Sequence, residues 1–160
     1  MPAQATAEFG IGRTTSDQVF RDHYKSVYRL ALSMSGNHAD AEDIAQEAFV
    51  AIIRALPRFR GESKLSTWIY RITLRVSTKW LAKRSVTEEL PPALPAADHS
   101  IPIDLINALR KLPIDLRMVI LLVAVEGLSH GEVAEVLGIP VGTVASRLHY
   151  ARKRLIDLLN

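Results

Sequence analysis

The stretch GLSHGEVAEVLGIPVGTVASRLHYARKRL, residues 127–155, carries the strongest structural signal in this sequence. Ser129 and Glu132 have the spacing of a capping box, in which each side chain satisfies an unpaired backbone donor at the start of a helix. Gly138 favours a tight turn after this helix, because a residue without a Cβ adopts left-handed conformations easily. Pro140 suits the first turn of a second helix. This order of signals is typical of a helix-turn-helix.

The second helix of this motif, predicted at about residues 141–158, has one apolar and one polar face. One face of this helix recurs at helical spacing, and we expect it to pack inward: Val144, Leu148, Ala151, Leu155 and Leu158. Polar side chains and an arginine near the helix start suit contacts with base edges in the major groove of DNA. Thr143, Arg147, Tyr150 and Arg154 share the polar face, and Arg152 and Lys153 add charge suited to phosphates. A plain amphipathic hairpin with solvated charges is the alternative interpretation.

Apolar residues recur at steps of three and four through most of the remaining chain, and no alternating strand pattern is present. The sequence therefore predicts an all-α protein. Further helices are expected at about residues 20–34, 39–55, 66–84, 105–112 and 116–125. On the first of these, the predicted buried face consists of Phe20, Tyr24, Val27, Ala31 and Met34.

The composition changes abruptly after residue 84, where Pro91, Pro92 and Pro95 lie among alanine and acidic residues. Such a segment is typical of an extended linker, so we expect two small helical domains joined by an acidic, proline-containing connection. The predicted organisation is a flexible arm at residues 1–14, a first domain at 15–84, a linker at 85–101 and a helix-turn-helix domain at 102–160.

The composition excludes several classes of protein. Cysteine is absent from the 160 residues, which rules out disulfides and thiolate metal ligands. The five histidines are scattered without metal-ligand spacing, and neither a nucleophile motif nor a phosphate-binding glycine loop is present, so we expect no metal, no cofactor and no enzyme. The sequence shows neither a membrane-spanning apolar run nor a signal peptide, and a cytoplasmic protein without membrane insertion is predicted.

Basic residues dominate the segment from residue 54 to residue 84, where nine lysines and arginines face one acidic residue, Glu62. Arg71 and Arg75 begin a stripe that repeats every four residues, and Trp68 and Tyr70 lie between the basic residues. Cations can follow a phosphate backbone while aromatic rings stack on unpaired bases. The segment therefore predicts a surface for single-stranded nucleic acid. Core packing of the tryptophans with a solvated stripe is the alternative.

The preceding helix has the opposite charge. Asp40, Asp43 and Glu47 recur on one face, together with Gln46 and an exposed Val50. Carboxylates in the first turn of a helix can simply complement the helix dipole, but this explanation does not account well for Glu47, which lies beyond the first turn. A protein partner is the second interpretation of this acidic face.

Taken together, these segments resemble the extracytoplasmic-function sigma factors, the small specificity subunits of bacterial RNA polymerase. The resemblance begins at about residue 17 and covers nearly all of the chain after it. Four stretches carry it: DAEDIAQEAF at residues 40–49, FRGESKLSTWIYRIT at 59–73, LRKLPIDLRMVILL at 109–122, and the helix-turn-helix.

The resemblance implies that the chain binds core RNA polymerase, at the clamp helices of the largest subunit and at the flap, and recognises the −10 and −35 promoter elements. The implied polymerase-binding residues are Asp43, Gln46, Glu47 and Phe49. The residues implied in melting the −10 element and holding the non-template single strand are Arg60, Ser63, Lys64, Trp68, Tyr70, Arg71 and Arg75. The last helix would read the duplex −35 element, and an anti-sigma factor is an implied partner. The implied −35-binding residues are Val141, Thr143, Ser146, Arg147, Tyr150 and Arg152.

Three residues depart from the family pattern. Arg75 and Lys79 stand where the family often has Asn and Asp, and Ala145 replaces a basic residue of the recognition helix. Each change alters a group near the nucleic acid, so promoter specificity is not inherited from the resemblance. A stand-alone helix-turn-helix regulator is the alternative function, although such proteins usually dimerise to read two half-sites. An adaptor that binds polymerase without reading DNA is a third possibility.

Overall fold

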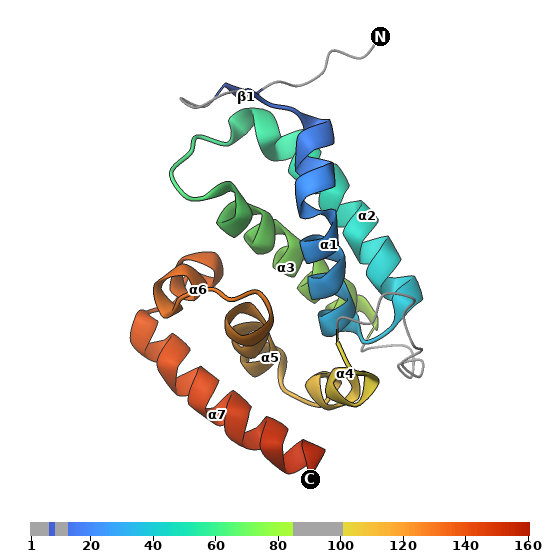
Figure 1. The fold of residues 1–160 in the computed structure, drawn as a ribbon, viewed down its shortest axis with the longest axis vertical. Coiled ribbons are helices and arrows are strands. Elements are labelled where there is room, and N and C mark those ends of the chain that lie inside the picture. The colour runs from blue at the N-terminus through green and yellow to red at the C-terminus, as the bar shows by residue number, and fades with distance from the viewer. Residues whose placement is uncertain (1–6, 9–12, 85–100) are drawn as a thin grey trace.

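The computed structural model describes residues 7–8, 13–84 and 101–160 (Figure 1). α-Helices make up most of this part of the chain, which confirms the predicted all-α class. The first lobe contains α1 (Ser16–Ser35), α2 (His38–Ala55), the 3-10 turn η1 (Leu56–Arg58) and α3 (Leu65–Arg84). The second lobe contains α4 (Ile103–Arg110), α5 (Ile114–Ile120), the π-helical turn η2 (Leu121–Val125), α6 (His130–Leu137) and α7 (Val141–Leu159).

Two predicted segments lie largely outside this description. The linker falls almost entirely on residues 85–100, which are not described. Within the predicted arm, two-residue strands β1 (Ala7–Glu8) and β2 (Arg13–Thr14) pair antiparallel. These strands were not predicted from the sequence, because they are too short to show an alternating pattern.

The first lobe is a three-helix unit whose helix ends are set by local side-chain contacts. Thr15 and Gln18 form a capping box at the start of α1, and Asn37 accepts a hydrogen bond from the backbone N–H of Asp40 at the start of α2. Gly36 separates these helices with a φ of +80°. The three helices enclose an apolar core with Val27, Ala48, Ile52, Leu56 and Ile69 among its members.

Two predicted faces in this lobe were partly wrong. Val27, Ala31 and Met34 of α1 are buried as predicted, but Phe20 and Tyr24 are 45% and 40% exposed. The two rings lie over the edge of the core rather than inside it. On α2, Asp40 is buried because its carboxylate pairs with the Arg84 guanidinium and accepts from the Asn37 amide, so it does not belong to an exposed acidic face.

The second lobe is built around α5 and α7. Of the inward residues predicted on α7, Val144, Leu148 and Ala151 are fully or almost fully buried, and Leu155 is half-buried. The prediction is wrong for Leu158, which is 38% exposed near the end of the helix. The apolar stretch predicted as one helix at residues 116–125 is α5 followed directly by η2, where the N–H of Glu126 donates to the carbonyl of Leu121 at 3.0 Å. Glu126, which follows this π-helical turn, faces the first lobe, where its carboxylate contacts Arg29 and Tyr70.

The two lobes pack closely, with α1 and α3 of the first lobe resting on α4, α5 and α6 of the second (Figure 1). Two apolar clusters of the described residues cross this seam. The larger joins Leu30 and Leu74 to Val119 and Leu122, and the smaller joins Ile44 of the first lobe to Ile106 of the second. Burial of apolar surface stabilises a folded structure by about 25 cal/mol for each Å² removed from water. The lobes therefore share a core instead of being connected by the linker alone.

Arg117 of α5 ties the end of α1 to the second lobe. Its side chain is 7% exposed and donates to the Met34 carbonyl at 2.7 Å, and to the carbonyls of Arg110 and Leu112 at 2.7 and 2.9 Å. Burial lowers the pKa of Arg117 to about 10. The two terminal nitrogens of the guanidinium thus compensate the carbonyl-rich end of α1, while its Nε atom is buried without a hydrogen-bond partner among the described residues.

Gly36→Ala is expected to destabilise the protein more than Gly138→Ala. Both glycines have a positive φ, so each alanine costs about 1–2 kcal/mol of backbone strain. A Cβ at Gly138 would meet open space, whereas one at Gly36 would overlap the Arg110 side chain and add about 1–3 kcal/mol of overpacking. Urea denaturation of the two variants measures the difference, and equal losses would contradict the close packing of α4 on Gly36.

Candidate nucleic-acid interface

A pocket of about 390 Å³ opens in the first lobe where η1, the following loop and the start of α3 meet. Its wall contains the rings of Phe59 and Trp68, whose centroids lie 4.9 Å apart at an interplanar angle of 37°. The complete lining is Arg58, Phe59, Arg60, Glu62, Ser63, Trp68, Arg71 and Glu135. Aromatic walls with basic groups at the rim suit an unstacked base and its phosphate.

The structure unites most of the predicted melting residues around this pocket. Arg60, Ser63, Trp68 and Arg71 line it, and the Lys64 side chain extends beside it. Trp68 is half-buried and also packs on the core of the first lobe, so the core-packing and pocket-lining interpretations both describe it.

Tyr70 and Arg75 lie apart from the pocket wall. Arg75 is exposed on the next turns of α3, whereas Tyr70 is only 8% exposed and faces the second lobe. Burial first, and the neighbouring Glu126 carboxylate second, raise the pKa of Tyr70 to about 12, so the phenol remains a neutral donor. A direct contact between Tyr70 and DNA would require the lobes to separate.

Of the predicted polymerase-binding residues, three are exposed and one is buried. Asp43, Gln46 and Glu47 are exposed on α2 and form an acidic ridge. Phe49 is 4% exposed, with its ring centroid 4.9 Å from that of Phe20, because its position on α2 points between α1 and α2. Phe49 therefore lies beneath the ridge in this structure, and its role in polymerase binding stays a prediction.

Sequence reasoning missed the apolar surface beside this ridge. Val50 was recognised as exposed and is 44% accessible, but Phe20 and Tyr24 had been placed in the core. The three side chains give the acidic ridge an apolar border. Both rings lie in the first half of α1 and contact Phe49 at its side, with centroids 4.9 and 6.0 Å from that ring, which the spacing of apolar residues could not distinguish from core positions.

The helix-turn-helix has the predicted local structure. The Ser129 hydroxyl accepts from the N–H of Glu132 at 3.1 Å, and the Glu132 carboxylate accepts from the N–H of Ser129 at 3.2 Å. These bonds lower the pKa of Glu132, the backbone contact with Ser129 contributing most. Gly138 ends α6 with a φ of +66°. The turn then directs α7 across the outer face of the second lobe (Figure 1).

The outer face of α7 carries the candidate base-reading groups. Val141 and Tyr150 are 51% and 58% exposed, Ser146 and Arg152 are exposed, and Thr143 and Arg147 are half-buried. The Arg147 Nε atom lies 4.0 Å from the Asp115 carboxylate of α5. By helical spacing, Thr143, Ser146, Arg147 and Tyr150 share one side of α7, whereas Val141 and Arg152 lie on the opposite flank of its exposed surface.

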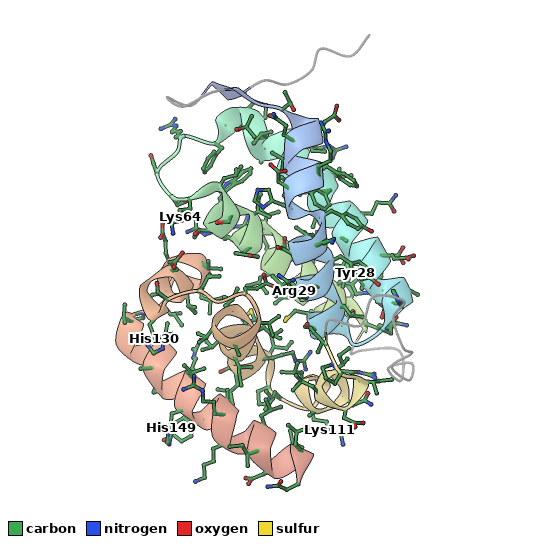
Figure 2. The ribbon with its side chains drawn as sticks, in the orientation of Figure 1. Tyr28, Arg29, Lys64, Lys111, His130 and His149 are labelled. Carbon is green, nitrogen blue, oxygen red and sulfur yellow. The ribbon has the colours of Figure 1, made fainter. Side chains whose placement is uncertain are left out.

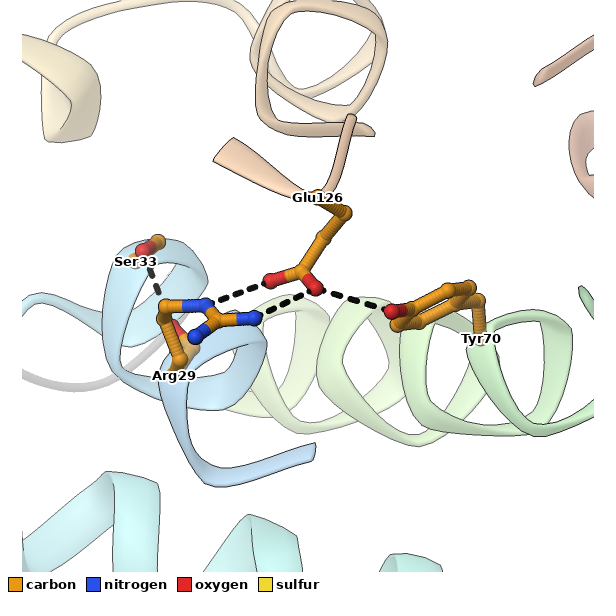
Figure 3. A network of polar contacts seen from close by, with 4 residues as sticks. All are labelled: Arg29, Ser33, Tyr70 and Glu126. Atoms are coloured by element: carbon orange, nitrogen blue, oxygen red, sulfur yellow. Dashed lines mark hydrogen bonds and ion pairs between the residues drawn. The ribbon is translucent and has the colours of Figure 1, made fainter. Parts of the chain in front are cut away.

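A polar network that the sequence did not reveal connects the lobes (Figure 3). The Arg29 guanidinium donates through Nε and Nη2 to the two oxygens of the Glu126 carboxylate, each at 2.8 Å. The Tyr70 hydroxyl donates to the same carboxylate at 2.9 Å. The Glu126 side chain is 1% exposed, and its hydrogen bonds to Arg29 raise the pKa of that guanidinium.

Other types of site are absent from the described residues. Residues 7–8, 13–84 and 101–160 contain no group of histidine and acidic side chains able to hold a metal ion. Within the same ranges, no helix has the length and apolar character needed to cross a membrane. Figure 2 shows His130 and His149 on separate helices at the surface of the second lobe.

Comparison with known families agrees with this geometry. The model of sigma-70 region 2 matches residues 19–87, and the model of sigma-70 region 4 matches residues 103–155. The chain belongs to the sigma-70 family. These matches correspond to the two lobes, and the curated relatives place the chain among the extracytoplasmic-function members.

Two mycobacterial sigma factors illustrate the relationship. The extracytoplasmic-function sigma factor SigE of Mycolicibacterium smegmatis is 35% identical over 157 residues, which cover 89% of this chain and 61% of SigE. The chain thus spans less than two thirds of that relative. SigM of Mycobacterium tuberculosis is 34% identical, with 92% of this chain and 78% of SigM covered.

Among solved structures, the sigma factor RpoE of Bartonella quintana in complex with the anti-sigma factor NepR superposes with a TM-score of 0.79. The sequences are 26% identical, and the superposition covers 89% of this chain and 95% of RpoE. Because both lobes are included, the likeness extends to their relative placement.

Proposed function

We propose that this chain binds core RNA polymerase, directs it to −35 and −10 promoter elements, and promotes melting of the DNA for transcription initiation. The observation that carries this proposal is the presence of two different nucleic-acid surfaces on one chain: an exposed recognition helix for duplex DNA and a basic, aromatic-walled pocket for a single strand. The role is that of a regulatory subunit in the cytoplasm, without catalytic chemistry of its own.

Recognition of the −35 element is assigned to α7. Thr143, Ser146 and Arg147 lie in its first two turns, where a recognition helix meets base edges in the major groove. Exposed Arg152 adds a cation suited to phosphate oxygens, and Val141 supplies an apolar contact at the helix start.

Melting of the −10 element is assigned to the pocket of the first lobe. A flipped base would stack against the rings of Phe59 and Trp68, which compensates a cost of about a few kcal/mol for unstacking. Arg60, Lys64 and Arg75 are exposed around it and can follow the displaced backbone. Tyr70 could join this surface only after the lobes part.

Docking on polymerase is assigned to the acidic ridge of Asp43, Gln46 and Glu47. The ridge combines exposed carboxylates with the apolar Val50, a combination that suits a basic, partly apolar helical partner such as the clamp helices. The flap is assigned to the second lobe by the family resemblance. An anti-sigma factor is proposed as a further partner, supported by the RpoE complex with NepR.

The alternative of a stand-alone regulator is less well supported. A regulator that binds duplex DNA unaided needs a recognition helix and a dimer contact. It has no use for an aromatic single-strand pocket or for an acidic ridge on a separate lobe.

The direct test is transcription from a genomic fragment library by purified core RNA polymerase, with and without this chain. Initiation from a defined set of sites only when the chain is present is the expected result. Sequence-specific binding of duplex DNA by the chain alone, without any initiation, would instead establish the stand-alone regulator.

Glu47→Lys is expected to weaken binding to core polymerase while leaving the fold intact. Glu47 is exposed, so reversing its charge changes the ridge without disturbing the core. Affinity for core polymerase is measured by fluorescence anisotropy of the labelled chain. Asp22→Lys, an equal charge change on an exposed residue of α1, serves as the control. Unchanged affinity of Glu47→Lys would refute the docking assignment.

Arg147→Ala is expected to weaken binding to a −35 duplex by about 1–3 kcal/mol if the arginine contacts guanine through two hydrogen bonds. The loss is measured by comparing the cognate duplex with a scrambled one. Arg154→Ala, on an exposed position further along α7, is expected to reduce both affinities equally, as a phosphate contact does. An equal loss on both duplexes for Arg147→Ala would make it a phosphate contact as well.

A further inference from the structure

The second lobe lies directly against the single-strand surface of the first. Lys64 Nζ is 3.4 Å from the Glu132 carboxylate of α6, and the Arg71 guanidinium donates to the Glu135 carbonyl at 2.7 Å. The Glu135 residue also lines the pocket that contains Phe59 and Trp68. Helix α6 therefore occupies positions that a displaced DNA strand would need.

The closed arrangement treats the two nucleic-acid surfaces differently. Two cations of the first lobe, Lys64 and Arg71, are engaged by α6, and Tyr70 is buried in the seam. The outer face of α7 remains open, with Val141 and Tyr150 more than half exposed. Closure thus leaves the duplex-reading surface accessible, whereas at the single-strand surface it engages Lys64 and Arg71 and buries Tyr70.

The Glu126 network, formed by Arg29, Tyr70 and Glu126, fixes the position of the second lobe against the first in this closed arrangement. It places three charge-assisted hydrogen bonds on one carboxylate that is 1% exposed. A buried carboxylate is costly unless all its partners are present. Both Arg29 and Tyr70 belong to the first lobe, so Glu126 is satisfied in the closed state by contacts that the second lobe cannot provide alone.

The network is suited to reversible closure. When the lobes separate, Glu126 and Arg29 both return to water, and the recovered hydration offsets much of the lost attraction. The apolar cluster across the seam supplies the remaining affinity between the lobes. A partner that competes for either lobe can therefore shift the balance towards the open state.

We propose that the Glu126 network latches the chain in an autoinhibited state, in which α6 partly masks the single-strand surface, at Lys64, Arg71 and one wall of the pocket, while α7 stays available for duplex DNA. The inference rests on the proposed function of the pocket. It predicts that the free protein binds a −35 duplex but binds single-stranded DNA poorly until the latch is released.

The opening of the lobes can be measured without DNA. The chain has no native cysteine, so Lys25→Cys on α1 and Asp157→Cys on α7 place one spin label on each lobe at exposed positions. Double electron–electron resonance measures the distance between the two labels. We expect one short distance in the labelled protein that keeps Glu126, and a longer, broader distribution of distances when Glu126→Gln or Glu126→Ala is added. Asp104→Asn, at an exposed carboxylate of α4, is the control and keeps the short distance.

Single-strand binding provides the second measurement. Glu126→Gln is expected to bind a mixed-sequence single-stranded oligonucleotide about tenfold or more tightly than wild type, because apparent affinity scales with the fraction of molecules in the open state. Binding to a mixed-sequence duplex is expected to stay unchanged. The charge swap Arg29→Glu with Glu126→Arg rebuilds the ion pair and is expected to restore the short distance and the weak single-strand binding.

Two outcomes would overturn the inference. An unchanged label distance in both Glu126 variants would show that the network does not hold the lobes together. A longer distance without any gain in single-strand affinity would show that closure does not mask that surface. Thermal unfolding followed by circular dichroism verifies that each variant is folded. The transcription assay with wild-type chain tests the proposed function separately, since the distance measurement involves neither DNA nor polymerase.

Discussion

The apolar cluster shared by the two lobes is the constraint on which the rest of the structure depends. Leu30 and Leu74 cannot leave water without the second lobe, and Val119 and Leu122 cannot do so without the first. Every polar group carried into the seam must then find a partner across it. Arg117 meets this requirement with the Met34 carbonyl, which also ties the end of α1 to α5.

The same constraint determines which chemical surfaces are presented. Burial of the seam turns Tyr70 away from solvent and brings Glu126 to Arg29. It leaves the acidic ridge on α2 and the outer face of α7 on opposite sides of the contact, both open. A chain with two nucleic-acid surfaces therefore exposes them unequally, and the difference arises from packing between lobes rather than from either lobe alone.

Sequence reasoning succeeded where a structure depends on neighbours within one or two helical turns. The Ser129–Glu132 capping box, the turn at Gly138 and the buried Val144 all follow from local spacing, and each was confirmed. It failed where burial depends on a distant partner. Asp40 has the spacing of an exposed ridge residue, but Arg84 draws it into the protein.

The sequence by itself determined the all-α class, the helix-turn-helix and the family, because capping, periodicity and turn chemistry are local properties of the chain. Only the tertiary structure decided that Phe49 supports a ridge instead of forming it, and that Tyr70 faces a carboxylate instead of DNA. The partners Arg29 and Glu126 are 97 positions apart. No periodicity links residues at that separation, and their contact exists only because two lobes bury a common core.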